Sequence, residues 1–298
     1  MKPNRKTFIG GSDIAAIMGM SRWKSPLQLW AEKTGTLPEQ DLSDNEAVEL
    51  GTELEDFVAK KFTRKTGLKV RQAPQIYVHK DYDYFKCQVD RLVTNTNELL
   101  EVKTTSAWKV KEWAGEEIPQ EYILQVNWQL GITGRDKGWL AVLIGGQKFR
   151  TKEMMFDKKL FDKQIEMALG FWVCVQNKTA PMATGIDNPF MIELNPTHND
   201  TLKEADDEMN TKIGLLMETK FHIDQLKETQ DLVEAQIKQV IGDSLGIKTS
   251  QYSVTWKQQA RSSVDTEKLK ADNLYEKYQK LSSTRVLRVK KGETNGNA

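Results

Sequence analysis

Apolar residues recur at helical spacing through the first part of the chain. Ser12 is expected to cap a short helix at residues 14–18, and Ser25-Pro26 begins a second helix that ends near Gly35. A longer amphipathic pattern covers residues 44–67 and ends on a glycine, a common helix C-terminal residue. Its expected apolar face consists of Leu54, Phe57, Val58 and Phe62. The sequence therefore predicts three helices before the first strand.

A β-rich stretch follows these helices. Residues 74–78, 84–93 and 98–104 have the composition and bounding turn residues of strands. Asparagines at both ends of the short segment 95–97 predict a turn between the last two strands. We therefore expect a hairpin that belongs to a larger sheet.

Helices and strands alternate in the next segment. A helix is predicted at 120–132, strands are predicted at 139–144 and 149–156, and Asp157 is expected to cap a further helix. The apolar face of this last helix contains Leu160, Phe161, Ile165, Leu169 and Trp172. The pattern up to this point predicts a domain of mixed α and β structure.

A proline-containing loop with Pro181, Pro189 and Pro196 predicts a boundary. After it the composition shifts towards charged helix, with apolar residues at multiples of seven that Gly214 and Gln230 interrupt. The heptad positions are Leu202, Met209, Leu216, Ile223 and Ile237. A helical hairpin or coiled coil is the expected structure.

The end of the chain is expected to contain a strand at 252–256 and a helix at 265–278. The segment 285–291 contains four cations and no acidic residue, which makes it a candidate for contact with a phosphate backbone. We therefore divide the chain into a core at 1–190 and a helical, coiled-coil extension with a basic tail at 197–298.

Composition narrows the classes of function. The 298 residues include 43 Lys and Arg and 42 Asp and Glu, so nucleic acid would have to bind at local patches rather than on a uniformly basic surface. Two cysteines and the lack of a leader or a long apolar run favour a cytoplasmic protein without a membrane segment. The three histidines lack zinc-ligand spacing, and no glycine-rich nucleotide loop occurs, which argues against zinc chemistry and ATP hydrolysis.

The residues that indicate chemistry lie on the predicted hairpin. Glu101 and Lys103 share one face of their strand, and pairing brings Asp90 beside Glu101 on that face. Two carboxylates are suited to hold Mg²⁺, and an adjacent lysine can orient or deprotonate a water for attack on phosphorus. The alternative is a solvated strand face that carries one ordinary ion pair.

The order of elements around these residues favours the catalytic interpretation. It resembles the PD-(D/E)xK nuclease superfamily and, within it, the lambda exonuclease and YqaJ-like viral recombinase family, over about residues 5–175. The resemblance implies an α+β core of the restriction-endonuclease type, with a central mixed sheet flanked by helices. The proline that commonly precedes the superfamily's aspartate is Val89 here, which weakens the motif without removing a ligand.

The same resemblance implies roles for further residues. Glu55, in the segment Gly51-Thr52-Glu53-Leu54-Glu55, corresponds to a helical glutamate of the metal site, although both glutamates can instead line a hydrated helix face. The implied metal set is Asp90, Glu101, Val102 and Glu55. Gln125 corresponds to a glutamine that orients the attacking water or its lysine partner.

The N-terminal segment resembles the family's site for a DNA end. Ser12 corresponds to a phosphate contact, and Arg5, seven residues earlier, to an arginine that helps to hold the terminal 5′-phosphate. The alternative is a plain helix cap with a flexible arginine. The segment from Trp108 to Trp113 can stack on a single-stranded product or pack as an amphipathic helix, and we favour packing.

The resemblance implies a Mg²⁺-dependent exonuclease, with Mn²⁺ as a substitute. Such an enzyme digests linear double-stranded DNA from 5′ to 3′ and leaves a 3′ single strand for a single-strand annealing recombinase. It also implies a homo-oligomer, often a trimeric ring, encoded by a phage or prophage and acting in the bacterial cytoplasm. The alternatives are a related iron–sulfur or helicase-associated nuclease, an inactive DNA-end or recombinase-binding adaptor, and an assembly scaffold. Two cysteines cannot ligate a cluster that needs four, and a scaffold has no need of an acid pair.

Overall fold

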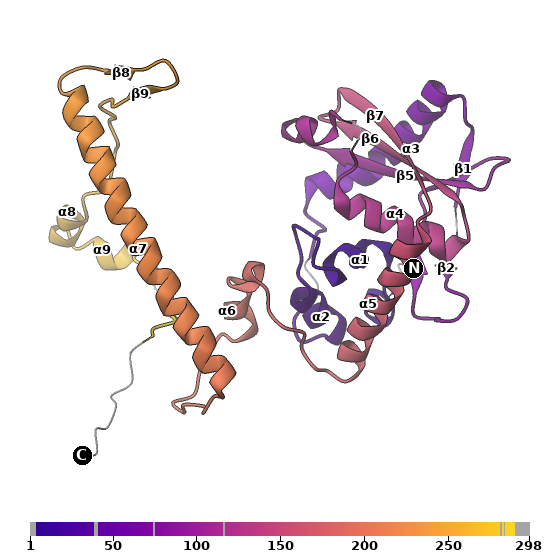
Figure 1. Cartoon of the computed structure of the whole chain (residues 1–298), viewed down its shortest axis with the longest axis horizontal. Coiled ribbons are helices and arrows are strands. Elements are labelled where there is room, and N and C mark those ends of the chain that lie inside the picture. The colour runs from indigo at the N-terminus through magenta and orange to yellow at the C-terminus, as the bar shows by residue number, and fades with distance from the viewer. Residues whose placement is uncertain are drawn as a thin grey trace. The chain divides into compact units, whose positions relative to one another are not determined.

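The computed structural model describes residues 4–38, 41–73, 75–115, 117–280, 282 and 284–289. The chain divides into two units, Met1–Asn195 and Pro196–Ala298 (Figure 1). The first unit contains the predicted hairpin and all the candidate site residues. Within the part of the chain that the structure describes, no helix has the length and apolar character needed to cross a membrane.

The first unit contains six α-helices and seven strands among the described residues. The helices are α1 (Gly11–Ile17), α2 (Pro26–Thr34), α3 (Glu46–Thr66), α4 (Gln120–Thr133), α5 (Lys158–Gln176) and α6 (Phe190–Leu194). The strands are β1 (Val70–Gln72), β2 (Tyr77–Val78), β3 (Lys86–Cys87), β4 (Arg91–Val93), β5 (Glu98–Thr105), β6 (Lys137–Ile144) and β7 (Lys148–Met155). Short 3₁₀ helices cover Arg5–Thr7, Ala107–Trp113 and Gly185–Asp187.

A mixed five-stranded sheet forms the centre of this unit, in the order β1-β4-β5-β6-β7. Only β5 and β6 run parallel, joined by the crossover helix α4, and the other neighbours are antiparallel. The turn between β4 and β5 contains Asn95 at φ +63°, a left-handed conformation that asparagine adopts more readily than most residues. The predicted hairpin and mixed α+β class are confirmed.

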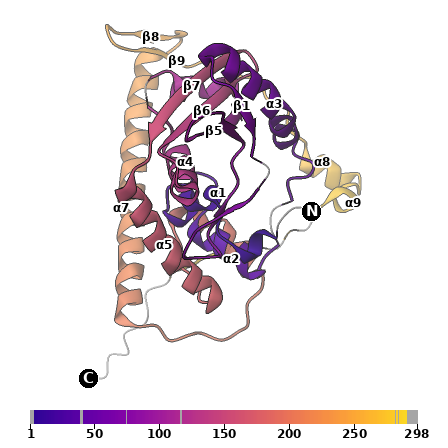
Figure 2. The same cartoon turned by 90° about the vertical axis from the view of Figure 1, so that its right-hand side faces the viewer.

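The two faces of the sheet carry separate cores. Side chains of α1, α2, α4 and α5 pack with one face, where Gly131 allows close contact because a Cβ there would overlap the Phe161 ring. Helix α3 covers the other face through Val58, Ala59 and Phe62 (Figure 2). The exposed fraction of Phe57 is 47%, so the prediction that it belongs to the apolar face of this helix is wrong.

Local sequence determines several helix ends. Ser25 accepts a hydrogen bond from the N–H of Gln28 and Pro26 opens α2, while Asp157 accepts one from Leu160 and caps α5, as predicted. The predicted cap at Ser12 is wrong. Helix α1 begins at Gly11, and the Asp13 carboxylate accepts from the N–H of Gly10 over 2.9 Å.

The predicted strand at 84–93 is two strands in different sheets. Strand β3 pairs with β2, and a parallel bridge joins Ile9 to Phe85, whereas β4 joins the central sheet. Long-range contacts with the N-terminal segment therefore divide this stretch. The strand predicted at 74–78 is confined to Tyr77–Val78, and Pro74 lies outside the described residues. Strand β1 was not predicted.

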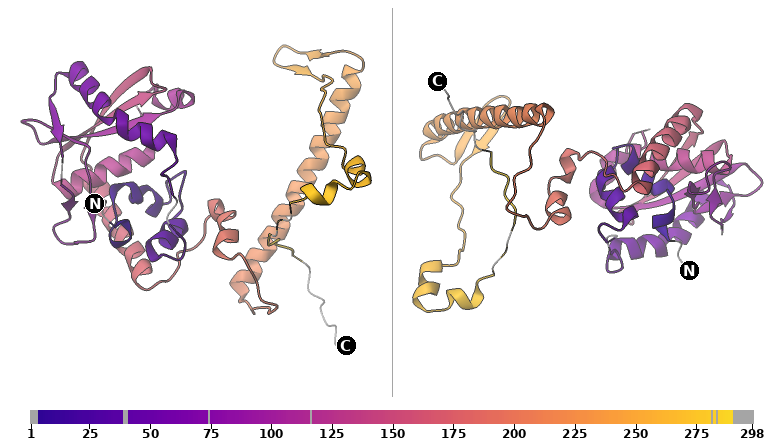
Figure 3. Two further views of the ribbon diagram at one scale, coloured as in Figure 1. Left: turned by 180° about the vertical axis from the view of Figure 1, so that it is seen from behind. Right: turned by 90° about the horizontal axis from the view of Figure 1, so that it is seen from below.

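The second unit is built around one helix. Helix α7 (Asp207–Ile241) is continuous over 35 residues, so the predicted hairpin is wrong (Figure 3). Leu202 lies before this helix. Of the heptad side chains within it, Met209 and Ile223 are exposed and Leu216 and Ile237 are half-buried. The predicted proline loop before this unit contains the short helix α6.

The remaining elements of the second unit are short. Strands β8 (Gly246–Lys248) and β9 (Ser253–Thr255) form a hairpin. The helix expected at 265–278 is divided into α8 (Thr266–Ala271) and α9 (Tyr275–Tyr278), with Asn273 at φ +55° between them. Residues 285–289 of the basic tail have no regular structure, and Lys290 and Lys291 lie outside the described residues.

Candidate active site

Pairing of β4 with β5 brings Asp90 and Glu101 together. Arg91 pairs with Leu100 in the antiparallel register, so Asp90 and Glu101 follow as neighbours at the end of the ladder. The N–H of Val102 donates to Asp90 Oδ2 over 2.7 Å. The structure thus places the two acidic groups on one side of the sheet.

The Glu101 carboxylate is almost fully buried and accepts three side-chain hydrogen bonds. Lys103 Nζ lies 2.6 Å from Oε1, and Gln125 also donates to Oε1. Gln129 donates to Oε2 over 2.7 Å and to the carbonyl of Gln88 over 2.9 Å. The predicted residues Asp90, Glu101, Lys103 and Gln125 are therefore assembled in one place.

Gln129 is a member of this site to which the sequence analysis assigned no role. It lies four residues after Gln125 on α4, and this spacing places both amides on the same helix face. That spacing is the signal that identifies it. Its Oε1 is buried and, among the described atoms, has no hydrogen-bond partner.

Electrostatics at the site favour a bound cation. Burial and the adjacent Glu101 carboxylate raise the pKa of Asp90 to about 8. Burial alone would lower the pKa of Lys103, but the carboxylates of Glu101 and Asp90 outweigh it and hold that pKa above its ordinary value. One ammonium group thus faces two carboxyl groups. This oxygen donor set fits a hard divalent cation such as Mg²⁺, whose charge would relieve their repulsion.

Glu55 forms an ion pair with Arg91 beside this cluster. The Arg91 guanidinium donates to both Glu55 and Asp56 of helix α3. The charge of Glu55 still acts on Asp90 and raises its pKa further. Within the described ranges, no three acidic, histidine or cysteine side chains form a metal-binding group. A role for Glu55 at the metal stays a prediction.

Val102 takes part in the site through its backbone and not through its side chain. Its side chain is buried in the core beneath α3, and its N–H is bonded to Asp90. Because valine has no side-chain ligand atom, only its carbonyl oxygen is available as a metal ligand.

Arg5 and Ser12 line a separate pocket of about 270 Å³. Arg5 Nη2 donates to Ser12 Oγ over 2.6 Å and to Asp13 Oδ1 over 3.0 Å. Lys33 Nζ lies 2.8 Å from the other Asp13 oxygen. Burial would raise the pKa of Asp13, but Lys33 and Arg5 outweigh it and lower that pKa. Two cations therefore surround one buried carboxylate, and the exposed Ser12 and Arg5 remain open to an anion.

The tryptophans after β5 differ in their environments. Trp113 is buried and stacks on Tyr122, with 5.5 Å between ring centroids. The exposed fraction of Trp108 is 93%, so the expected packing is correct for Trp113 and wrong for Trp108. Lys109 Nζ lies 4.7 Å from the ring centroid of Trp23.

Comparison with solved structures identifies the class of fold. The structure resembles the alkaline exonuclease LHK-Exo from Laribacter hongkongensis, with a TM-score of 0.51 and 22% identity over 58% of this chain and 90% of that chain. LHK-Exo in complex with dAMP gives a TM-score of 0.51 and 23% identity, with the same coverage. The chain therefore has the α+β nuclease fold, as predicted.

Sequence comparison identifies the family. The model of the YqaJ-like viral recombinase domain matches residues 2–136. The YqaJ protein of Bacillus subtilis (strain 168) is 35% identical over 294 residues, which are 96% of this chain and 92% of that protein. The chain belongs to the YqaJ-like viral recombinase family, and the predicted resemblance is confirmed.

Proposed function

We propose that this chain is a Mg²⁺-dependent exonuclease that digests linear double-stranded DNA. The observation that carries the proposal is the assembly of Asp90, Glu101 and Lys103 at the end of a hairpin. The membership of a viral recombinase family and the fold shared with an alkaline exonuclease support it. Mn²⁺, which also prefers oxygen ligands, is expected to substitute for Mg²⁺.

Each residue of the site has a distinct task in this proposal. Asp90 and Glu101 would hold the cation, and the Glu55 carboxylate and the Val102 carbonyl oxygen would be its further ligands. The bound cation supplies Lewis-acid activation of a water and stabilisation of the leaving oxygen. Lys103 is protonated at neutral pH because its pKa is raised, so it is suited to orient the water by donation. Gln125 donates to Glu101 through its amide nitrogen, and in this proposal its amide oxygen accepts from that water.

The pocket of Arg5 and Ser12 would hold the terminal 5′-phosphate of a duplex end. This contact favours digestion from 5′ to 3′ and a 3′ single strand, which a single-strand annealing recombinase would then bind. A homo-oligomer, as a trimeric ring, would retain the DNA between cuts. The resemblance supports these finer parts of the proposal and an origin in a phage or prophage acting in the bacterial cytoplasm.

Digestion of defined DNA ends tests the proposed function. The purified protein is incubated with linear duplex that carries a 5′-phosphate or a 5′-hydroxyl, and with circular duplex, in Mg²⁺ or in EDTA. Mononucleotides should be released from linear DNA in Mg²⁺ and not from circular DNA. Binding of DNA ends without any Mg²⁺-dependent release would instead identify an inactive adaptor.

Replacement of Arg5 by alanine should weaken the preference for a 5′-phosphate. The preference for phosphorylated over hydroxyl ends is expected to fall by roughly 10- to 100-fold, the value of one hydrogen bond between charged groups. Initial rates on the two duplexes measure it. Arg150→Ala removes an exposed arginine from β7 and should leave the preference unchanged. An unchanged preference in Arg5→Ala would exclude this pocket as the phosphate site.

A further inference from the structure

One segment of this nearly neutral chain is strongly basic. No Asp or Glu occurs in residues 57–80, whereas six Lys and Arg occur in residues 60–71. The segment covers the second half of α3, the turn at Gly67 and strand β1. The cations are Lys60, Lys61, Arg64, Lys65, Lys69 and Arg71. A local patch of this kind is what DNA binding requires when the net charge is only +1.

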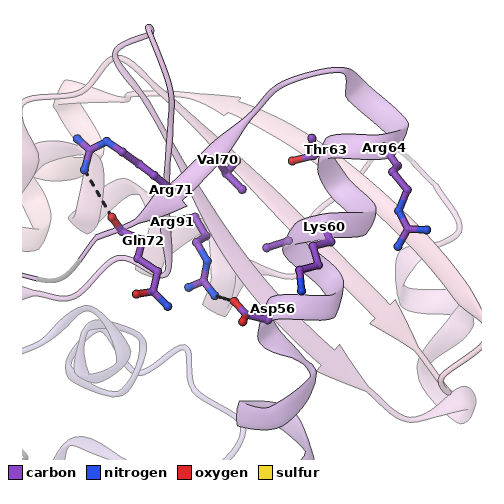
Figure 4. A pocket seen from close by; sticks show the side chains of 9 residues that line it. Asp56, Lys60, Thr63, Arg64, Val70, Arg71, Gln72 and Arg91 are labelled. Carbon is purple, nitrogen blue, oxygen red and sulfur yellow. Dashed lines mark hydrogen bonds and ion pairs between the residues drawn. The ribbon is translucent and has the colours of Figure 1, made fainter.

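Part of this segment lines an open groove of about 530 Å³ between α3 and β1. Figure 4 shows Lys60, Thr63 and Arg64 on the helix side, and Val70, Arg71 and Gln72 on the strand side. Arg91 and Asp56 lie between them and are paired with each other. Lys60 points towards Asp56 and Arg91, whereas the guanidinium groups of Arg64 and Arg71 extend outward from the helix and from the strand, so the positive charge lies in the groove and along its two rims.

The cations on the two sides of the groove are available to a ligand. Lys60, Arg64 and Arg71 are exposed, and among the described residues none of them forms an ion pair with an acidic side chain. Arg71 makes only a long hydrogen bond of 3.5 Å to the carbonyl of Gln72. Asp56 is the one acidic residue of the lining, and Arg91 neutralises it. The groove thus has an excess of uncompensated positive charge.

The groove is connected to the candidate active site through Arg91. This guanidinium, buried at the inner wall, also donates to Glu55 and to the carbonyl of Asp90. The neighbouring carboxylate of Asp90 belongs to the proposed metal site on the opposite face of the same strand pair. The groove and the proposed metal site therefore lie on opposite faces of the strand pair β4–β5 and are linked by Arg91.

We propose that the groove between α3 and β1 binds phosphates of the DNA substrate away from the bond that is cut. None of the nine lining residues is aromatic, so the groove lacks a platform for base stacking and contacts the sugar–phosphate backbone. Lys60, Arg64 and Arg71 supply the charge, and Thr63 and Gln72 supply neutral hydrogen-bonding groups. The contact is independent of sequence. It rests on the proposed function in that DNA is taken as the substrate.

Salt-dependent DNA binding tests this groove. The triple variant Lys60→Ala, Arg64→Ala, Arg71→Ala is compared with Lys158→Ala, Lys159→Ala, Lys163→Ala, which removes three exposed lysines from α5. Affinity for a labelled duplex, and for a single strand of equal length, is measured in EDTA between 50 and 200 mM salt, on the scale over which phosphate contacts respond. Thermal unfolding of all three proteins verifies that they are folded.

The groove variant should lose on the order of 10-fold in affinity per cation at 0.1 M salt, and the slope of log affinity against log salt should fall by about 0.9 for each lost duplex contact. The α5 variant should keep the wild-type slope. A larger loss for duplex than for single strand assigns the groove to the uncut substrate, and the reverse assigns it to the product strand. Wild-type affinity and slope in the groove variant would overturn the proposal.

Nucleotide release and DNA affinity test the proposed activity and the proposed groove separately. If the wild type releases nucleotides in Mg²⁺ but the groove variant binds DNA normally, the exonuclease proposal stands and the groove is excluded. If the groove variant loses DNA affinity but the wild type never releases nucleotides, the groove stands and the proposed activity is wrong.

Discussion

Replacement of Lys103 by alanine is expected to lower Mg²⁺-dependent nucleotide release by ~10²–10⁴-fold, the usual contribution of a group that handles a proton or orients the attacking water. Lys103 is the cation that contacts Glu101, with Nζ at 2.6 Å from Oε1. Its loss removes the donor for the water but leaves both carboxylates in place. Initial rates on linear duplex measure the effect, while DNA affinity in EDTA should be retained.

The control for this result removes a lysine that lies eight residues later in the sequence. Lys111→Ala changes an exposed residue of the 3₁₀ helix after β5 and should keep its rate within about threefold of wild type, because isolated surface substitutions change little. Lys103→Gln keeps a hydrogen-bond donor near Glu101 and should fold like wild type but remain inactive. A rate in folded Lys103→Ala close to that of wild type would remove Lys103 from the reaction.

Asp90→Asn should abolish nucleotide release and at the same time stabilise the metal-free protein at alkaline pH. Burial and Glu101 raise the pKa of Asp90 to about 8, against about 4 for an unfolded aspartate. Its contribution to folding is therefore fully present below pH ~4 and is lost as the pH rises through ~8. Asparagine does not titrate and can still accept from the N–H of Val102. The gain in unfolding free energy at pH 9 should be on the order of a few kcal/mol, because each unit of pKa difference corresponds to about 1.4 kcal/mol.

Thermal unfolding at several pH values measures this second effect. The difference between Asp90→Asn and wild type should be large at pH 9 and small at pH 5, and Mg²⁺ should raise the melting temperature of the wild type alone. Asp83→Asn makes the same chemical change at an exposed position and should show neither effect. Equal stability of Asp90→Asn and wild type at every pH would mean that folding does not raise the pKa of Asp90.

Helices and the site hairpin were predictable because their determinants are local. Ser25 and Asp157 cap their helices within the next three residues, and the apolar spacing of α4 marks a helix at Gln120–Thr133. Asp90 and Glu101 come together because one tight turn joins their strands. Alternation of side chains then places Lys103 on the same face as Glu101.

Contacts between distant segments were not predictable in the same way. The bridge from Ile9 to Phe85 divides a stretch that has the composition of one strand. The partner of Glu55 is Arg91, 36 residues later, and nothing in the helix pattern indicates that pairing. The groove depends on β1, whose three residues carry too little pattern to be recognised. Tertiary packing therefore decided these features.

The two cores on either side of the sheet differ in size, and this difference should affect how easily the helices that cover them open. The core beneath α3 contains seven buried residues, far fewer than the core on the other face. Local opening of a helix costs the contacts that the helix itself makes, so we expect α3 to open at a lower free-energy cost than the helices of the larger core. Amide protons of α3 should then exchange with solvent sooner than those of α4. Glu55, Lys60 and Arg64 lie on this helix, so DNA bound as proposed should slow the exchange of its amide protons.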